Sequence, residues 1–224
     1  MSLKKYLLWS VTLCTILMSF IDGVIVPPYW LKSMFKIILF LIVPTVCILV
    51  NKEHKGHFKK LFIPQKKDFL LSLGLGIAVF AIILLGFWLL GDYIDFEGIV
   101  NNLTSGIGVN ANNFIYVALY ISFCNSLLEE FFFRGYAFLL MKEVSSRKKA
   151  YIFSAAMFAI YHAGMMTGWF NVFIYAIAMI GLFVAGCLFN WLNDKCNNIY
   201  PSWLVHMFAN FGINLVGAII FGIV

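Results

Sequence analysis

Apolar residues follow one another along most of this chain in long runs, which short charged segments interrupt. Several runs reach the roughly 18–20 residues that a helix needs to cross the hydrocarbon core of a bilayer. They do not alternate apolar and polar positions, as the strands of a membrane β-barrel do. The pattern therefore predicts an all-α, polytopic transmembrane helical bundle of seven spans, or eight if one run is broken. The runs are Tyr6–Val26, Tyr29–Val50, Phe69–Leu90, Asn113–Met141, Ala150–Met166, Trp169–Trp191 and Pro201–Gly222.

Composition agrees with a membrane protein. Of the 224 residues, 62% are hydrophobic and 12% are charged, whereas soluble domains carry about twice that charged fraction. We therefore expect one integral membrane domain over residues 1–224, without a separate soluble domain. Two boundaries are weakly marked: Pro27 and Pro28 alone separate the first two runs, and the fourth run is long enough to begin with a surface helix.

Lysine placement predicts the orientation, because cytoplasmic loops of membrane proteins are enriched in Lys and Arg. Lys4 and Lys5 precede the first run, Asn51–Asp68 holds six lysines, and Lys142–Lys149 is also basic, whereas Gly91–Gly98 is acidic. The N-terminus is therefore expected in the cytoplasm. The net charge of +6 then reflects orientation and some attraction to anionic lipid. No nucleic-acid partner is expected, since the basic loops contain no recognisable binding motif.

Ionisable side chains inside the predicted spans are candidates for function, because burying them in a membrane is costly. Asp22, Lys32 and Lys36 lie near the ends of spans, so we expect them to reach the membrane interface. The remaining polar candidates are Glu129, Glu130, Arg134, His162, His206 and the nearby Asn210.

The two adjacent glutamates are predicted to differ in role. Glu130 and Arg134 are spaced i, i+4, so they share a helix face and can form a charge-assisted pair that fixes this face. Glu129 points about 100° away and has no expected local partner. An unpaired carboxylate in a low-dielectric medium is a candidate for proton exchange.

Two histidines lie on later spans, and His206 and Asn210 are again spaced i, i+4. Counted along helices from the basic ends, Glu129, His162, His206 and Asn210 lie at roughly 15–20 Å, so we expect them at a similar depth. Such a group suits hydrolysis: Glu129, alone or with His162, would take a proton from water. His206 and Asn210 would donate hydrogen bonds to the oxyanion.

A divalent metal such as zinc, held by Glu129, His162 and His206, is the alternative way to activate the water. The sequence has no HExxH motif and no third histidine inside the spans. A serine triad is not indicated either, because no GxSxG elbow occurs.

Three motifs follow one another along the spans: EExxxR as "EEFFFR", Glu129–Arg134; FxxxH as "FAIYH", Phe158–His162; and HxxxN as "HMFAN", His206–Asn210. In this order they resemble the CPBP intramembrane protease family, the CAAX-protease and bacteriocin-processing group that is also called the Abi family. The resemblance covers about Glu129 to Asn210, within an expected catalytic core of about 113–222.

The resemblance implies an intramembrane endopeptidase whose site opens toward the cytoplasm. Family members are described as metalloproteases and as metal-independent glutamate proteases. We favour the latter, without a cofactor, because Glu129 and His162 can activate water themselves. The implied catalytic residues are Glu129, His162, His206 and Asn210, with Glu130, Arg134 and Phe158 in support.

The chain's richness in Phe, Ile, Lys and Asn indicates an AT-rich bacterial genome. Bacterial members of the family are associated with bacteriocin or peptide maturation and self-immunity. The expected partner is therefore a membrane-associated peptide or protein substrate at the lipid bilayer of a bacterial plasma membrane. A proteolytically silent membrane adaptor and a proton-coupled transporter remain as alternatives, since buried carboxylates and histidines also form proton relays.

Overall fold

The computed structural model describes residues 2–50, 63 and 69–224, so nearly all of the basic segment Asn51–Asp68 lies outside the described residues. In the described part of the chain every regular element is helical, which confirms the predicted all-α bundle. The helices are α1 (Leu3–Phe20, continued by a π-helical turn at Ile21–Ile25), α2 (Tyr29–Ile37), α3 (Val43–Val50), α5 (Phe69–Leu90), α6 (Phe96–Asn101), α7 (Phe114–Tyr120), α8 (Ser126–Glu129), α9 (Met141–Val144), α10 (Arg147–Met165), α11 (Val172–Cys196) and α12 (Tyr200–Ile220).

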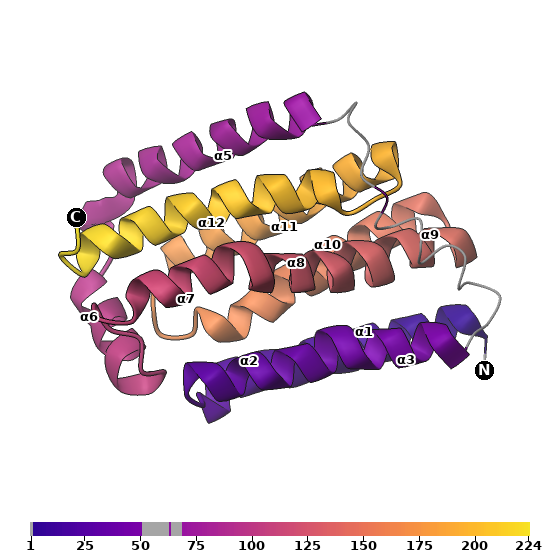
Figure 1. Ribbon diagram of the computed structural model, residues 1–224, viewed down its shortest axis with the longest axis horizontal. Coiled ribbons are helices and arrows are strands. Elements are labelled where there is room, and N and C mark those ends of the chain that lie inside the picture. Colours follow the sequence, from indigo (N-terminus) through magenta and orange to yellow (C-terminus); the bar gives the residue numbers. More distant parts are fainter. Residues whose placement is uncertain (1, 51–62, 64–68) are drawn as a thin grey trace.

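Six helical stretches in the described residues are long and apolar enough to cross a membrane. They are Leu3–Ile25, Tyr29–Val50, Phe69–Tyr93, Phe114–Val144, Val172–Cys196 and Tyr200–Ile220. A seventh long helix, α10, runs beside them between the same two ends of the bundle (Figure 1). It is less apolar because it begins with three cations, and it packs against α1 and α11. The protein is thus a multi-pass membrane protein, and the predicted span count is close.

The fourth apolar run, predicted over Asn113–Met141, forms one continuous helix, Phe114–Val144. The chain before it turns at Asn110–Asn113, where Asn113 Nδ2 donates to the Gly108 carbonyl at 2.8 Å. The short helix α6 comes earlier and is separate. Two π-helical stretches, Ile121–Asn125 and Glu130–Leu140, flank α8. Such stretches often occur at functional sites.

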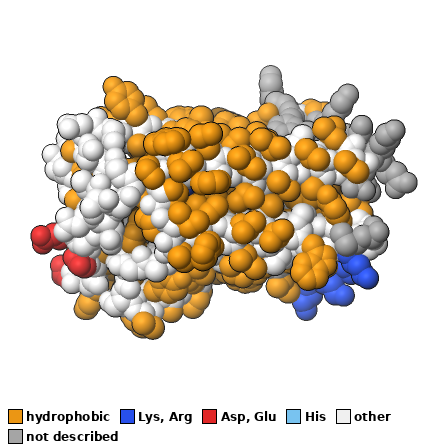
Figure 2. Space-filling model, turned by 90° about the horizontal axis from the view of Figure 1, so that it is seen from below, with side chains coloured by type: hydrophobic (Ala, Val, Ile, Leu, Met, Phe, Trp, Pro, Cys, Tyr) orange, Lys and Arg blue, Asp and Glu red, His pale blue; other side chains and the backbone are white. Residues whose placement is uncertain are grey.

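Charge is distributed unequally between the two ends of the bundle. Figure 2 shows a broad apolar surface between Lys and Arg side chains at one end and Asp and Glu side chains at the other. The N-terminus and α9 lie at one end of Figure 1, and α6 and the C-terminus lie at the opposite end. This separation agrees with the lysine pattern from which we predict a cytoplasmic N-terminus.

The helix that carries the two glutamates lies at the centre of the bundle, where all eleven residues of Glu130–Leu140 are buried. An aromatic cluster joins it to its neighbours. The Phe40 ring, from the segment between α2 and α3, stacks on Phe132 with centroids 4.2 Å apart and meets Tyr161 of α10 edge to face at 5.2 Å. Aromatic pairs of this kind add roughly 0.5–1.5 kcal/mol beyond their buried area. The N-terminal helices are therefore packed directly on the central helix.

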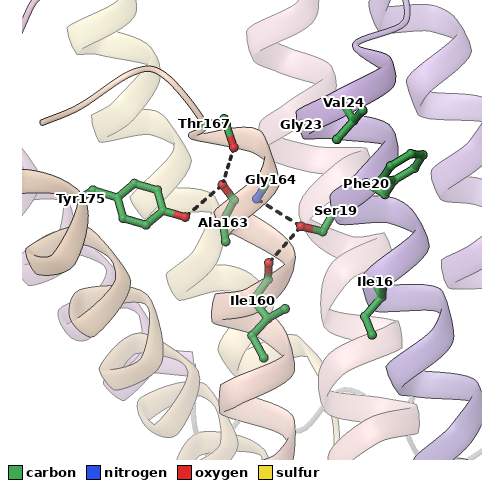
Figure 3. A pocket seen from close by; sticks show the side chains of 10 residues that line it. All are labelled: Ile16, Ser19, Phe20, Gly23, Val24, Ile160, Ala163, Gly164, Thr167 and Tyr175. Carbon is green, nitrogen blue, oxygen red and sulfur yellow. Dashed lines mark hydrogen bonds between the residues drawn. The ribbon is translucent and has the colours of Figure 1, made fainter. Parts of the chain in front are cut away.

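Close packing between α1 and α10 depends on glycine. The Gly164 amide donates to Ser19 Oγ at 3.1 Å, and Ser19 Oγ donates to the Ile160 carbonyl at 3.3 Å (Figure 3). A Cβ placed on Gly164 would overlap the Ser19 carbonyl oxygen. A larger side chain at this position would therefore push the two helices apart.

We expect Gly164→Ala to lower the free energy of unfolding by roughly 1–3 kcal/mol, the usual cost of overpacking. Thermal and denaturant unfolding in detergent micelles would measure it. Gly181→Ala on α11 is the matched control, because a Cβ there meets nothing within 4 Å. It should be neutral or slightly stabilising, since alanine favours helix. Equal stability of the two variants would contradict the proposed close packing.

Candidate active site

Glu129 lies midway along the 31-residue helix Phe114–Val144 and is 2% exposed. One of its carboxylate oxygens, Oε1, accepts three hydrogen bonds. Asn125 Nδ2 donates at 2.8 Å, Lys36 Nζ at 3.1 Å and the Tyr161 hydroxyl at 3.2 Å. Charge-assisted bonds to a carboxylate are stronger than neutral ones. This oxygen is therefore fixed in place.

The other oxygen, Oε2, faces the two histidines. His162 Nε2 and His206 Nε2 each lie 3.8 Å from it. Among the described residues, Oε2 has no hydrogen-bond partner although it is buried. A separation of this size between polar groups is one that a water molecule commonly bridges. The free oxygen and the two Nε2 atoms are thus placed so that one bridging water would contact all three.

Glu130 points to a different set of partners. Its Oε2 lies 3.5 Å from Arg134 Nε, as the i, i+4 spacing predicts, and also accepts from the Ser202 hydroxyl. Its Oε1 lies 2.9 Å from His206 Nδ1. These donors compensate the charge of a side chain that is fully buried. Glu130 is therefore held by α12 as well as by its own helix.

Hydrogen bonding fixes which nitrogen of each histidine carries a proton. His162 Nδ1 lies 2.8 Å from the Phe158 carbonyl, which can only accept, so Nδ1 is protonated and Nε2 is an acceptor when the ring is neutral. His206 Nδ1 donates in the same way to Glu130. The Nε2 atoms of both rings are therefore the ones that face Glu129 Oε2.

Arg134 is enclosed by aromatic rings. Its guanidinium carbon lies 4.1 Å from the centroid of Phe158 and 4.8 Å from that of Phe189, and the side chain is fully buried. Phe158 also contacts both histidine rings, with centroids 4.5 Å from His162 and 5.9 Å from His206. The first residue of the FxxxH motif thus packs the arginine and both imidazoles together.

Asn210 is one helical turn beyond His206 on α12, but its Nδ2 donates to the Ile121 carbonyl at 3.2 Å. An amide has two N–H groups, so one remains for another acceptor. The structure therefore brings Glu129, His162 and His206 together and leaves Asn210 on the adjoining turn of the same helix.

Two expectations from the sequence are wrong. Glu129 does have a local partner, because Asn125 lies four residues earlier and donates to it. Lys36 and Lys32 do not reach the membrane interface but are 4% and 7% exposed. The Lys32 ammonium pairs with buried Asp22 at 3.1 Å. Each lysine is retained inside the bundle because a carboxylate neutralises it.

Sequence reasoning missed four contributors to the site, of which two left a partial signal. Asn125 and Glu129 have i, i+4 spacing, and so do the two lysines of α2. Ser202 and Tyr161 carry no pattern of their own, since only the packing of distant helices brings them near the glutamates. The site residues that the sequence alone did not identify are Lys36, Asn125, Tyr161 and Ser202.

A metal does not fit the site as it is arranged. No group of three His, Cys, Asp or Glu side chains in the described part of the chain is placed to hold a metal ion. Each ligand atom of a tetrahedral zinc site lies about 2.0–2.1 Å from the metal, which brings the ligand atoms close to one another. Glu129 Oε2 is 3.8 Å from each histidine Nε2, which is farther apart than such ligands lie. The Lys36 ammonium already neutralises this carboxylate. We therefore derive no step through a metal.

A cleft of about 440 Å³ opens between α1 and α10 near the end of α10 (Figure 3). The Tyr175 hydroxyl and Thr167 Oγ1 each donate to the Ala163 carbonyl at 3.2 Å. Exposed Phe20 and Val24 lie on its α1 side. Because its polar side chains bond within the protein, this cleft is an apolar surface feature beside the polar site.

The fold and the site define a multi-pass helical membrane protein with a buried cluster of carboxylates, histidines and cations. Residues 111–212 match a model of the family described as type II CAAX prenyl endopeptidase, Rce1-like. This is the CPBP/CAAX protease family, so the match confirms the resemblance carried by the three motifs and indicates a membrane endopeptidase. Comparison with curated proteins and with solved structures gave no match.

Proposed function

We propose that the protein is an intramembrane endopeptidase of the metal-independent glutamate type. The observation that carries the proposal is the divided role of the Glu129 carboxylate. Oε1 is held by three donors, while Oε2 is buried, has no partner among the described residues and faces two imidazoles at 3.8 Å. A carboxylate presented in this way is suited to accept a proton from a bound water.

In this mechanism the water donates one hydrogen to Glu129 Oε2 and the other to His162 Nε2. Its oxygen attacks the carbonyl carbon of the peptide bond as its proton passes to Glu129. The C–O π electrons move to the carbonyl oxygen, which becomes an oxyanion. When the tetrahedral intermediate collapses, the C–N bond breaks and Glu129 returns the proton to the leaving nitrogen. Water is thereby divided between a new carboxyl group and a new amine.

The developing oxyanion needs donors that are already in place. His206 in its imidazolium form has two N–H groups, of which Nδ1–H binds Glu130 and Nε2–H points to the site. Asn210 retains one N–H after bonding to Ile121. We assign these two donors to the oxyanion, with Phe158, Arg134 and Glu130 holding His206 in position.

We further propose a cytoplasm-facing site in a bacterial plasma membrane and a membrane-associated peptide or protein as substrate. The separation of basic and acidic ends supports the orientation, and the composition supports a bacterial origin. We propose that the protein acts in the maturation of bacteriocin-like peptides or in self-immunity, and that this process supplies the substrate. The adaptor and the transporter are not developed further, because no observation in the structure favours them.

The proposal is tested by comparing membrane and secreted peptides, by mass spectrometry, from hosts that carry the wild type or Glu129→Gln at equal protein levels. Fragments present only with the wild type would establish proteolysis and identify the substrate together. Peptide profiles that are the same under inducing conditions would contradict the proposal and favour the adaptor.

A further inference from the structure

The N-terminal helices contribute a residue to the site although they lie outside the matched region 111–212. Resting on the proposed function, we propose that Lys36 of α2 is a positioning residue of the reaction. Its ammonium holds Oε1 of Glu129, so that Oε2 stays directed at the water and the two histidines. Lys36 acts through Glu129 and does not itself touch the substrate.

The contacts of Lys36 all lie inside the bundle. Its Nζ donates to Asn125 Oδ1 at 2.6 Å and to Glu129 Oε1 at 3.1 Å, and it lies 4.8 Å from the centroid of the Tyr161 ring. The side chain is 5% exposed. A lysine has about 2 kcal/mol of rotamer entropy to lose on being fixed, so this geometry is kept only because its acceptors are specific.

The Asn125 side chain bonds both Lys36 and Glu129, so the three residues hold one another in place. Its Oδ1 accepts from Lys36 while its Nδ2 donates to Glu129 Oε1 at 2.8 Å. The Tyr161 hydroxyl is the third donor to the same oxygen. Rotating the carboxylate would break all three bonds at once. The arrangement therefore distinguishes the two oxygens of Glu129 and keeps the free one pointing toward the histidines.

Charge balance also depends on Lys36. The site contains two carboxylates, Glu129 and Glu130, and Arg134 is the cation beside Glu130. Lys36 is the cation that hydrogen-bonds to Glu129. Besides Lys36 from α2, the titratable groups of the described residues that contact Glu129 are Tyr161 and His162 from α10 and His206 from α12. Without Lys36, Glu129 would keep Asn125 and Tyr161 as hydrogen-bond donors and the two histidine rings at 3.8 Å.

The same helix provides a matched control. Lys32 lies one turn before Lys36 and is buried to a similar degree, but its ammonium pairs with Asp22 at 3.1 Å. Lys32→Met and Lys36→Met therefore remove the same group from one helix, and only Lys36→Met removes a contact to the site. A difference between their effects on turnover isolates the contact with Glu129.

We expect Lys36→Met to lower kcat by roughly 100-fold, because a small misplacement of a catalytic group can cost this much. KM should change little, since the lysine does not contact the substrate. Lys32→Met should keep the wild-type kcat even if it lowers the melting temperature. The assay uses the purified full chain in liposomes and the peptide that peptide profiling identifies as cleaved.

Rescue separates positioning from folding. In Lys36→Ala the missing atoms beyond Cβ correspond to n-propylamine, whose ammonium can occupy the place of Nζ. Added n-propylamine should restore kcat at least 10-fold in a saturable manner, whereas 1-propanol, of the same size and neutral, should not. Equal effects of the two compounds, or none of either, would overturn the positioning role.

The pairing itself is measured by a cycle of melting temperatures, which needs no substrate. Lys36→Met should lower the melting temperature by on the order of 10 °C, since it leaves a buried carboxylate unpaired. The same change made in Glu129→Gln should cost less than half as much. Additive effects would overturn the pairing.

The outcomes of the two proposals are distinguishable. If Glu129→Gln abolishes turnover while Lys36→Met keeps the wild-type kcat, the proposed function stands and this inference fails. If the wild type cleaves nothing, the proposed function fails, and the catalytic role of Lys36 fails with it even where the melting cycle shows coupling.

Discussion

Glu129→Gln is expected to lower kcat by roughly 1,000-fold or more, because the variant loses the rate enhancement that a general base contributes. Glutamine has the same shape, and its carbonyl oxygen can still accept from Lys36, Asn125 and Tyr161. Its NH₂ group, however, takes the place of Oε2 and cannot remove a proton from water. Turnover of the peptide substrate, measured with the purified variant in liposomes, is the test.

The same reasoning predicts that this variant folds. The replacement keeps all three acceptor contacts at Oε1 but leaves the Lys36 ammonium without its buried counter-charge, so the melting temperature should fall by on the order of 10 °C while the protein still folds. Glu97→Gln, at an exposed glutamate of α6, is the control and should behave as the wild type. A folded Glu129→Gln protein that still cleaves the substrate would disprove the assigned role.

Much of the architecture could be predicted because membrane helices obey a simple constraint. Every backbone polar group in the bilayer must be paired within the segment, so long apolar runs such as Phe69–Leu90 read directly as helices. The start of α11 could not be read in this way. The apolar run begins at Trp169, but the helix begins at Val172, where the Asn171 side chain accepts from the Phe173 and Ile174 amides. Hydropathy does not register such a cap.

The candidate site was predictable to the extent that its residues lie on motifs with helical spacing. Glu130 and Arg134 form the pair that their separation indicates, and the two histidines reach Glu129 as their estimated depths required. Lys36 could not be foreseen, since its contact with Glu129 joins residues 93 positions apart and depends on how α2 packs. A lysine near a span end ordinarily reaches the interface, and here a buried carboxylate reverses that preference.

Replacing Arg134 should have the largest effect on stability. Arg134→Met removes the cation beside Glu130 while keeping an apolar side chain among the rings of Phe158 and Phe189. Glu130 would then be a fully buried carboxylate whose donors among the described residues are Ser202 and His206. Breaking a buried ion pair by removing one partner costs about 3–5 kcal/mol. Denaturant titration in detergent micelles measures this loss in the free energy of unfolding. The folded yield is a second measure.

The cause of that loss can be separated from lost packing. In the double variant Arg134→Met/Glu130→Gln neither charge remains, so most of the stability should return if the stranded carboxylate is the cause. A double variant as unstable as the single one would instead place the cost in the cation–π contacts of the guanidinium. Arg147→Met is the control, because that side chain is 67% exposed where it pairs with Asp194, and such pairs contribute little. An Arg134→Met protein that unfolds like the wild type would contradict the structural role, because the membrane interior would then tolerate Glu130 without its counter-ion.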